Sequence, residues 1–587
     1  MANMVSLTID GVKVQVREGT TVLEAARQAN IKIPTLCFLK GVNAIGACRV
    51  CVVDTGGKAL QASCVLPVAE GMVVKTNTPK VRNARKVNLE LILSTHDKKC
   101  LSCSRSQNCE LQQLCMEMGI DDSGRFEGER IEYTVDDFSP SVVRDNNKCI
   151  LCRRCVAACF QQQKVGVIGA VKRGFSTSIE SPWDLKLNET ACINCGQCIA
   201  VCPVGALQEK DETQLVWEML SDPTKHVVIQ PAPSIRVALG EEFGMPIGTD
   251  VTGKLVTALR RLGFDKVFDT DCGADFTIME EATELVGRVS NGGVLPMITS
   301  CSPGWVKFCE HYYPEFIPNL SSCKSPHQML GALIKSYYAQ KANIPVEDIR
   351  VVSVMPCTAK KFEADRPEMA GTGYPDVDAV VTTRELGRMI KEAGIEFVKL
   401  EESEFDNLLG ESSGAAVIFG ATGGVMEAAL RTAYDMITGE DLGKVEFEAV
   451  RGIQGIKEAT VDIGDLQVNV AVANGTANAA RLLDMIKEGK KQYHFIEIMA
   501  CPGGCVTGGG QPIISAQERM VSDPRKLRAQ ALYAQDKAKP LRKSHENPEL
   551  LETYKNFLGK PNGALAHQLL HTHYHERPKY PKTTTEE

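Results

Sequence analysis

Residues 149–159, CILCRRCVAAC, and residues 192–202, CINCGQCIAVC, decide the fold of the first part of this chain. Both runs have the spacing C-x2-C-x2-C-x3-C, and Pro203 follows the second. Where two such runs occur together, the fourth cysteine of each binds the cubane of the other, so the spacing predicts one small domain with two 4Fe4S clusters. The two expected ligand sets are Cys149, Cys152, Cys155 and Cys202 for one cubane, and Cys192, Cys195, Cys198 and Cys159 for the other.

The cysteines nearest to the N-terminus form a different pattern. Residues 36–53 read LCFLKGVNAIGACRVCVV, and QASC follows at residues 61–64. This arrangement is typical of the plant-type ferredoxin loop around a 2Fe2S cluster, although its first interval is longer here. Upstream, the sequence predicts a hairpin that turns at Asp10-Gly11 and a helix over residues 21–30. We therefore predict a β-grasp domain, and its expected cluster ligands are Cys37, Cys48, Cys51 and Cys64.

Between these groups, residues 96–109 read HDKKCLSCSRSQNC. Three thiolates and one imidazole can hold either a tetrahedral zinc or a further cubane, and the spacing alone leaves both open. The neighbouring cluster motifs favour the cubane. Its expected ligands are His96, Cys100, Cys103 and Cys109, and the nearby Cys115 is expected to be a core thiol.

Composition excludes several functional classes. The 587 residues contain 23 cysteines, too many for a reduced intracellular chain unless metal occupies them. Lys and Arg number 66 against 73 Asp and Glu, so the net charge of −7 provides no cationic surface for nucleic acid or anionic membranes. The first residues do not read as a signal peptide, and no apolar run reaches the roughly 18–20 residues that span a bilayer. We predict a cytoplasmic protein without nucleic-acid or membrane partners.

Residues 211–520 repeat a strand followed by a helix, which predicts an α/β domain with parallel sheets. The repeating segments begin at His226, Lys266, Val294, Val377, Ala415 and Val468. Parallel sheets carry their sites on loops at the carboxyl ends of strands. Three motifs lie there, namely TSCSPGW with Cys301, MPCTAKKFE with Cys357, and EIMACPGGCVTGGG with Cys501 and Cys505. Their convergence on one cleft would make a buried metal site.

These three motifs resemble the signature motifs of iron-iron (FeFe) hydrogenases. The order of the modules is similar to that of the large clostridial-type chains, and to the catalytic subunits of NAD(P)-linked multimeric hydrogenases. The resemblance implies an α/β catalytic domain with two parallel-sheet lobes, preceded by α+β ferredoxin-like modules. The implied domains are a plant-type 2Fe2S ferredoxin-like domain at 1–79, a one-His-three-Cys 4Fe4S domain at 80–140, a two-cluster 4Fe4S ferredoxin domain at 141–210, a catalytic domain at 211–520, and a helical small-subunit-like segment and tail at 521–587.

In that family the active site, called the H-cluster, is a cubane joined through one cysteine to a di-iron unit with CO, cyanide and azadithiolate. The resemblance implies that Cys357, Cys501 and Cys505 bind the cubane, with Cys505 as the bridge. Lys360 matches the residue that hydrogen-bonds the distal cyanide, a role that suits a cation in a dry pocket. The residues matching those that surround the di-iron unit are Ala232, Pro233, Ser234, Met355 and Met499.

A buried site also needs a path for protons. Glu281, Glu284 and Arg288 have the spacing of one helix face, which taken alone indicates a solvated surface. The family's relay runs thiol, Glu, Ser, Glu, Arg. The matching positions here are Cys301, Glu281, Ser321, Glu284 and Arg288. The resemblance therefore implies that these residues carry protons.

One position departs from the family pattern. The first motif normally has two consecutive cysteines, the second of which binds the cubane, but Ser302 stands there. Ser302 could bind iron through its oxygen, Cys301 could change role, or iron could take another ligand. Alternatively, the Ser302 hydroxyl caps the following helix. His327 stands where a Gln near the distal iron is expected, and the alternative for it is a polar packing residue.

The resemblance implies an anaerobic hydrogenase that interconverts two protons and two electrons with H2. Its cofactors would be one 2Fe2S cluster, three accessory 4Fe4S clusters and the H-cluster. Its partners would be ferredoxin or a flavin subunit that uses NAD(P), and maturation proteins would supply the di-iron unit. A hydrogen sensor and an electron-transfer subunit of a larger redox complex remain as alternatives. Residues 1–210 alone are similar to the latter, whereas residues 211–520 argue against it.

The remaining sequence adds two expectations. SHENPELLETYKNFLGKP at residues 544–561 resembles the family's small subunit, fused here to the catalytic chain. The histidines of residues 571–587 could bind metal, but the sequence favours a frayed tail. Cys272, Cys309 and Cys323 are expected to be core thiols.

Overall fold

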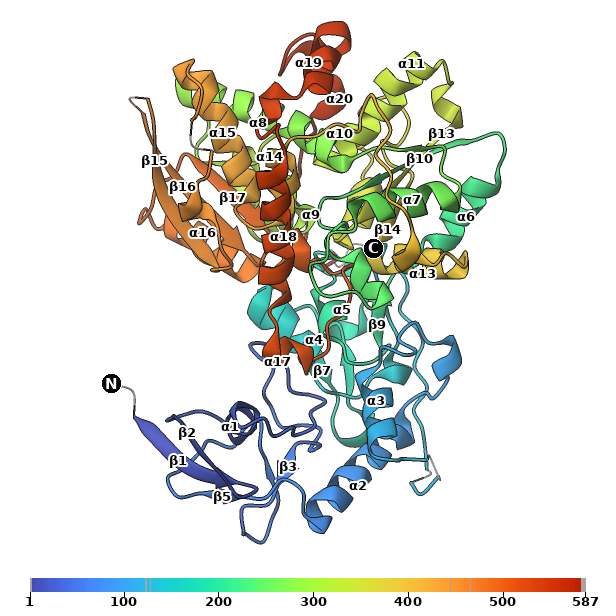
Figure 1. Cartoon of the computed structure of the whole chain (residues 1–587), viewed down its shortest axis with the longest axis vertical. Coiled ribbons are helices and arrows are strands. Elements are labelled where there is room, and N and C mark those ends of the chain that lie inside the picture. Colours follow the sequence, from blue (N-terminus) through green and yellow to red (C-terminus); the bar gives the residue numbers. More distant parts are fainter. Residues whose placement is uncertain (1–2, 122–123, 127, 444, 465, 582–587) are drawn as a thin grey trace, which may run out of the picture.

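Two four-stranded sheets lie within residues 211–520, the predicted catalytic domain, which is called the catalytic region below (Figure 1). The computed structural model describes residues 3–121, 124–126, 128–443, 445–464 and 466–581. One sheet has the strand order β11-β10-β13-β14, and the other has the order β12-β17-β16-β15. The first consists of β10 (His226–Pro231), β11 (Lys266–Val267), β13 (Ile349–Met355) and β14 (Ala379–Thr382), and the second of β12 (Met297–Ile298), β15 (Ile456–Ile463), β16 (Leu466–Asn474) and β17 (Phe495–Met499).

The predicted parallel pairing is confirmed for all neighbours in the first sheet and for two of the three pairs in the second. The exception is β15, which runs antiparallel to β16, with Ile456 opposite Ala473 and Ile463 opposite Leu466. Antiparallel neighbours can be joined by a hairpin, whereas parallel neighbours need a crossover, which is usually a helix. Such crossovers contain α7 (Thr252–Leu262) between β10 and β11, α12 (Ala359–Ala364) between β13 and β14, and α16 (Thr476–Lys487) between β16 and β17.

Most predicted strand-to-helix units are confirmed. They lead from β11 into α8 (Thr270–Ser290), from β12 into α9 (Pro303–Tyr312), from β14 into α13 (Thr383–Glu392) and from β16 into α16 (Thr476–Lys487). After β10 the chain instead makes turns and the 3-10 helix η7 (Leu239–Phe243) before α7 (Thr252–Leu262).

The strand predicted from Ala415 is wrong. Those residues form α14 (Gly414–Val417) and the 3-10 helix η12 (Ile418–Gly420), and Ser413 caps α14 by accepting the Ala416 N–H. A short apolar run that is buried on all sides has no polar residues at regular intervals, so its sequence is compatible with either a helix or a strand.

Helix α8 joins the two lobes. It packs against α10 (Pro326–Leu333) on one side and against α15 (Gly424–Thr438) on the other. Phe276 belongs to the core of the first lobe, whereas Ala274 and Ile278 belong to the core of the second. The polar residues further along α8 therefore lie between the lobes.

The N-terminal module contains a three-stranded sheet. Its strands are β1 (Met4–Ile9), β2 (Val12–Arg17) and β5 (Val73–Val74), in the order β2-β1-β5. The predicted hairpin is confirmed, and Asp10 and Gly11 at its turn have φ values of 48° and 86°. The predicted helix is α1 (Val22–Gln28), which begins with a capping box between Thr21 and Glu24.

Two further modules connect this sheet to the catalytic region. The first contains α2 (Pro79–Thr95), the 3-10 helix η1 (Cys100–Ser102) and α3 (Glu110–Glu117). The second contains the paired strands β6 (Val142–Arg144) and β9 (Leu207–Glu209), the paired strands β7 (Gly169–Val171) and β8 (Ser178–Glu180), and helices α4 (Arg154–Ala157) and α5 (Gln197–Val201). Arg154 ties all three modules together, because its guanidinium pairs with Glu110 at 2.8 Å and donates to Phe38 O at 3.0 Å.

The C-terminal segment wraps the catalytic region. It contains α17 (Glu518–Val521), α18 (Pro524–Ala538), α19 (Pro548–Thr553) and α20 (Ala564–Leu570), and in Figure 1 α18 crosses between the two sheets. The frayed tail predicted from residue 571 is wrong at its start, because His571 is buried and Arg577 pairs with Glu310 at 2.7 Å. Residues 582–587 lie outside the described part of the chain.

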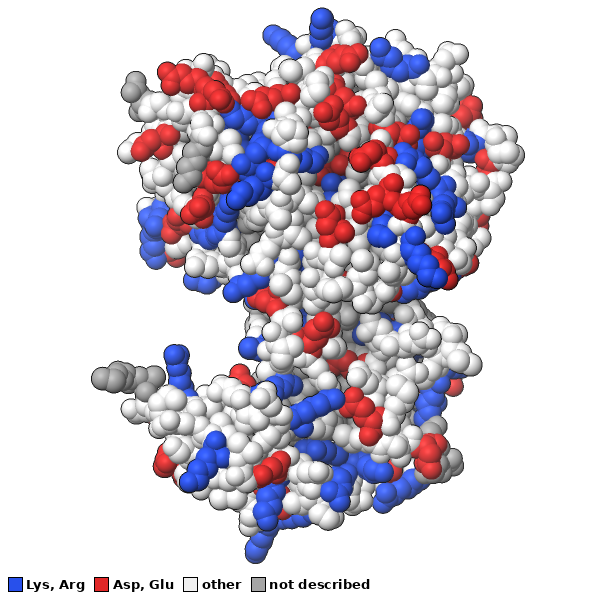
Figure 2. All heavy atoms as spheres, viewed as in Figure 1, with Lys and Arg blue, Asp and Glu red and all other residues white. Residues whose placement is uncertain are grey.

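The surface agrees with the charge balance. On the face in Figure 2, Lys and Arg are interspersed with Asp and Glu over the catalytic region. Among the described residues, no helix is both long and apolar enough to cross a membrane.

Candidate active site and electron relay

The cysteines of the two repeated runs surround two separate cavities. One cavity is lined by Cys149, Cys152, Cys155 and Cys202, and the other by Cys159, Cys192, Cys195 and Cys198. These are the two predicted ligand sets, each completed by the last cysteine of the other run. Burial raises the pKa of the Cys155, Cys195 and Cys198 thiols well above the usual value. A cavity with four thiols and mainly apolar walls fits a cubane, since iron supplies the positive charge that thiolates need there.

The N-terminal cysteine set is also assembled. The backbone N–H of Cys37 donates to Cys48 Sγ at 3.4 Å, and the N–H of Cys48 donates to Cys37 Sγ at 3.5 Å. Cys51 and Cys64 are both buried in the hydrophobic core of the N-terminal module. Backbone donors aimed at sulfur suit thiolates that carry the negative charge of a bound cluster.

The His96 set has two features that fit a bound group. His96 Nδ1 is buried and has no hydrogen-bond partner within the described structure, which is costly for a ring nitrogen unless a ligand occupies it. Gly205 leaves room beside this set, because a Cβ there would lie 2.5 Å from Cys103 Sγ. A cradle of this kind fits a metal group bound by His96 and Cys103.

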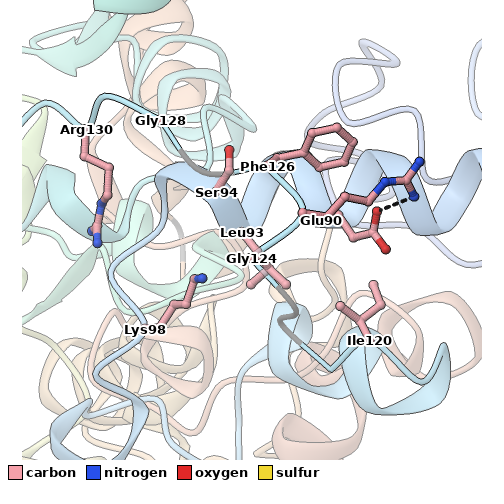
Figure 3. A pocket seen from close by; sticks show the side chains of 10 residues that line it. Glu90, Leu93, Ser94, Lys98, Ile120, Gly124, Phe126, Gly128 and Arg130 are labelled. Atoms are coloured by element: carbon pink, nitrogen blue, oxygen red, sulfur yellow. Dashed lines mark hydrogen bonds and ion pairs between the residues drawn. The ribbon is translucent and has the colours of Figure 1, made fainter.

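A surface pocket on the same module lies apart from these thiols (Figure 3). It lies between α2 and residues 124–126, 128 and 130, and the Arg125 guanidinium pairs with Glu90 there at 3.2 Å. The described residues that line this pocket include none of the predicted cluster ligands. The pocket is therefore distinct from the redox centres.

The second cubane set lies directly against the catalytic loops. Thr358, next to Cys357, donates through its hydroxyl to Asn194 O at 2.7 Å. Gly196 and Gly509 meet so closely that a Cβ on Gly509 would lie 2.5 Å from Gly196 Cα. The module with the two cysteine runs and the catalytic loops therefore pack directly against each other.

The three catalytic motifs begin at strand ends, as predicted. Cys357 follows β13, Cys501 follows β17, and Cys301 follows β12. A hydrogen bond from Cys501 lowers the pKa of the Cys357 thiol, so these two side chains meet. Burial, followed by the neighbouring Cys357, raises the pKa of Cys505 to about 12. Cys357 and Cys501, which are buried, and Cys505, which is half-buried, thus form one thiol cluster that fits a metal group.

Lys360 belongs to a buried network that the sequence did not reveal. Its ammonium donates to Cys301 O at 3.1 Å and to Glu363 Oε2 at 2.7 Å. The same oxygen accepts hydrogen bonds from Ser325 Oγ at 2.9 Å and from His327 Nε2 at 2.6 Å. Glu363 is the last residue of MPCTAKKFE, three residues after Lys360 on α12 (Ala359–Ala364), and that helical spacing was the available signal.

The His327 side chain packs against polar partners of the same network. Its ring is fully buried, and its Nδ1 lies 3.2 Å from Ser353 Oγ. Burial, then the nearby Lys360, lowers the pKa of His327 to about 4. The ring is therefore neutral near pH 7 and donates its Nε2–H to Glu363.

The predicted proton carriers are arranged from the buried site toward the surface. Burial, then Glu284, raises the pKa of Glu281 to about 8, although the Ser321 hydroxyl and the Ser300 backbone lower this pKa in part. Ser321 Oγ donates to Glu284 Oε2 at 2.9 Å, and Arg288 pairs with Glu284 Oε1 at 2.6 Å. Besides burial, Glu281 raises the pKa of Cys301, which indicates that the two side chains are neighbours.

Ser302 does not cap the helix that follows it. It occupies the N-cap position of α9, but its hydroxyl accepts no N–H of that helix and instead accepts the Ala500 N–H at 3.2 Å. The capping alternative is wrong, because the side chain points toward the loop of Cys501. Ser302 therefore lies at the thiol cluster.

The remaining predicted residues line the same region. Ala232 donates through its N–H to Val354 O at 2.9 Å, which places the loop after β10 beside the end of β13. Ser234 Oγ is buried without a hydrogen-bond partner within the described structure, so it is available to a bound group. Met355 and Met499 are the buried last residues of β13 and β17. Pro233 lies between Ala232 and Ser234 in the same loop.

Five segments of the chain match known protein families. Residues 225–509 match the iron only hydrogenase large subunit, C-terminal domain, and residues 522–577 match the iron hydrogenase small subunit. Residues 2–79 match a 2Fe-2S iron-sulfur cluster binding domain, residues 85–124 the NADH-ubiquinone oxidoreductase-G iron-sulfur binding region, and residues 148–206 a 4Fe-4S dicluster domain.

Individual proteins are also similar to this chain over most of its length. The chain is 50% identical to the NADP-reducing hydrogenase subunit HndD of Solidesulfovibrio fructosivorans, over 98% of this chain and 100% of the relative. It is 47% identical to iron hydrogenase 1 of Clostridium pasteurianum, over 97% of this chain and 100% of the relative. A solved FeFe-hydrogenase from Chlamydomonas reinhardtii covers 63% of this chain and 100% of its own, with 44% identity and a TM-score of 0.56.

Proposed function

The chain belongs to the iron-only (FeFe) hydrogenase family, and from that premise we propose how its residues carry out the reaction. It is a hydrogenase catalytic subunit with N-terminal iron-sulfur domains, an oxidoreductase that acts on hydrogen. An H-cluster held by Cys357, Cys501 and Cys505 would supply the iron at which protons and electrons combine to form H2. Ser302 lies where the fourth cubane ligand is expected.

Lys360 would orient the distal side of the di-iron unit. Its ammonium is held between Cys301 O and Glu363, so it presents a fixed positive charge in a site from which water is largely excluded. Charge-assisted hydrogen bonds are strongest in such surroundings. The Ser234 hydroxyl, which has no hydrogen-bond partner in the described structure, would face the proximal side of the di-iron unit together with Ala232 and Pro233. Met355 and Met499 would pack around the unit.

Protons would travel by the relay Cys301, Glu281, Ser321, Glu284 and Arg288. The observation that carries this proposal is the Glu281 carboxyl, which is fully buried beside Ser321 and has a pKa raised to about 8. A carboxyl with a pKa close to the working pH can both accept and release a proton. Glu284, paired with Arg288, would hand the proton to solvent.

Electrons would pass along one 2Fe2S cluster and three 4Fe4S clusters. Their proposed ligands are the four cysteine groups described above, with His96 completing one of them. Gly196, next to Cys195, contacts Gly509 of the catalytic loops, so the Cys159, Cys192, Cys195 and Cys198 cubane would be the last in the relay.

We retain the five-part division at residues 79/80, 140/141, 210/211 and 520/521 as a proposal, with a β-grasp fold for the first part. The relative HndD is named as a subunit of an NADP-reducing hydrogenase. We propose by similarity that this chain also works with partner subunits, of which one would carry flavin and use NAD(P). Ferredoxin is the alternative electron partner, and maturation proteins would deliver the di-iron unit.

The test is infrared spectroscopy of the matured chain together with assays of H2 evolution and uptake. Bands of CO and cyanide, with H2 evolved from reduced ferredoxin or viologen, are the expected result. A loaded chain that shows those bands but no turnover in either direction would favour the hydrogen-sensor alternative.

A further inference from the structure

Three potential metal-binding side chains meet beside the proton relay. Glu284 comes from α8, Cys323 from the segment before α10, and His571 from the segment that follows α20. One ligand atom from each lies within 4.8 Å of the other two. The set combines a carboxylate oxygen, a thiol sulfur and an imidazole nitrogen.

The backbone fixes two members of this set side by side. Cys323 and His571 are partners in an isolated antiparallel β-bridge. The flanking hydrogen bonds run from Lys324 N to Leu570 O at 2.8 Å and from Thr572 N to Ser322 O at 2.7 Å. The Cys323 and His571 side chains are therefore adjacent because of backbone pairing, and not through a chance surface encounter.

A second carboxylate orients the imidazole. His571 Nε2 lies 3.1 Å from Glu280 Oε2, and the other oxygen of Glu280 accepts a hydrogen bond from the Tyr554 hydroxyl. A carboxylate at one ring nitrogen keeps the proton there and leaves the other nitrogen free to bind a metal, an arrangement common around metal-binding histidines. The other nitrogen, His571 Nδ1, lies 2.8 Å from Ser322 Oγ, so a metal bound at Nδ1 would replace this hydroxyl contact.

The Glu284 carboxylate divides its contacts between its two oxygens. Oε1 pairs with Arg288 at 2.6 Å, whereas Oε2 accepts Ser321 Oγ at 2.9 Å and lies 3.9 Å from Cys323 Sγ. The Glu284 side chain is 13% exposed, whereas Cys323 and His571 are buried, so the set borders the surface at Glu284.

We propose that Glu284, Cys323 and His571 form a binding site for a zinc-like divalent cation, and that its occupation stops the proton relay. Mixed nitrogen, oxygen and sulfur donors suit borderline metals such as Zn²⁺. Binding would release the Cys323 thiol proton and occupy Glu284 Oε2, which is the oxygen that Ser321 contacts. The site itself stands on the geometry, whereas the inhibition rests on the proposed function.

The experiment uses the holoenzyme with its clusters loaded and titrates it with ZnCl2. Zinc-edge X-ray absorption should report one sulfur together with nitrogen and oxygen neighbours, and hydrogen turnover should fall and recover with EDTA. In Cys323→Ala and His571→Ala, the zinc concentration that halves the rate, measured against each variant's own uninhibited rate, should rise by about tenfold or more.

The matched control is Cys309→Ala, because Cys309 is a fully buried thiol that donates to Tyr313 O, away from the relay. Its zinc sensitivity should equal that of the unaltered chain. Cys323→Ser, which keeps the size of the side chain, serves if the alanine variant does not fold. It should lose the sulfur signal at the zinc edge.

The outcomes separate the site from the relay. Zinc sensitivity that is unchanged in both Cys323→Ala and His571→Ala, or a zinc edge without the expected sulfur and nitrogen, overturns the site and leaves the relay standing. Zinc bound by the three residues with undiminished turnover overturns the inhibition, and also contradicts a relay through Glu284.

Discussion

Lys360 donates to Glu363 at 2.7 Å, and this buried ion pair fixes the one cation that reaches Cys301 O among the described contacts. Burial alone would raise the pKa of Glu363, but Lys360 and then His327 outweigh it and lower that pKa to about 2. Glu363 is therefore ionised at any pH at which the protein would be assayed. The position of the Lys360 ammonium depends on this carboxylate.

Replacing Glu363 should damage both activity and stability. Glu363→Gln leaves the Lys360 ammonium buried without a counter-charge, which costs about 3–5 kcal/mol when one partner of a buried pair is removed. We expect the free energy of unfolding in urea to fall by that amount and hydrogen turnover to drop by about tenfold or more. The control is Glu396→Gln, because Glu396 forms an exposed pair with Lys399. Equal stability of both variants would contradict the role assigned to Glu363.

The relay predicts a selective loss of turnover. Glu281→Gln and Cys301→Ala should each reduce the rate by about 10²–10⁴-fold, because each removes a proton carrier. Iron content and the infrared bands should stay unchanged, since neither residue is a proposed ligand. Cys309→Ala, which removes a buried thiol elsewhere, should keep the parental rate. Parental rates in both relay variants would eliminate this path.

Glu281 also predicts how stability depends on pH. Its pKa is raised from 4.5 to about 8, so between these values the folded chain holds a proton that the unfolded chain has released. The folded state binds more protons, and stability from this group therefore falls as pH rises, by about 1.4 kcal/mol per unit at most. Urea unfolding of Glu281→Gln at several pH values should show a less steep decline. A slope as steep as that of the parent chain would contradict the raised pKa.

Ser302 predicts a change in redox potential. If its oxygen binds the cubane, Ser302→Cys should shift the potential of the active-site cluster, because thiolate donates more electron density to iron. Ser302→Ala should retain less iron, and it also leaves the Ala500 N–H without its acceptor, at a cost of about 1–3 kcal/mol. Redox titration and iron analysis show whether Ser302 binds the cubane. Identical potentials and iron contents in all three chains would exclude ligation by this side chain.

The close contact of Gly509 with Gly196 predicts a defect in electron transfer. A methyl group on Gly509 forces the two loops apart, and such overpacking typically costs about 1–3 kcal/mol. Gly509→Ala should slow reduction of the active-site cluster after the accessory clusters are reduced, as followed by rapid-freeze EPR. Gly169→Ala is the control, because a Cβ there meets no atom within 4 Å. Equal rates in both variants would place the electron path elsewhere.

The sequence predicted the elements whose pattern is local. The hairpin at Asp10-Gly11 and the helix after β14 carry turn and capping signals within a few residues, and both are confirmed. Ala415 was assigned wrongly because burial on all sides removes the periodicity that separates helix from strand. His571 was placed in a frayed tail because its pairing with Cys323 joins distant parts of the chain, and no local pattern records such a contact.

The role of Glu363 was missed for a related reason. Its place in MPCTAKKFE gives the helical spacing to Lys360, but its contacts with Ser325 and His327 come from the start of α10. Spacing within one motif predicts a neighbour on the same helix. It does not predict that three donors from two segments share one carboxylate oxygen.

The pairing of residues 322–324 with residues 570–572 sets an order of events during synthesis on the ribosome. Domains generally fold as units as they emerge, N-terminal first. The iron-sulfur modules are complete long before the ribosome reaches α20, whereas the segment beside Glu284 must wait for that helix and the residues behind it. A nascent chain would therefore contain folded iron-sulfur modules before residues 570–572 have paired with residues 322–324 of the catalytic region.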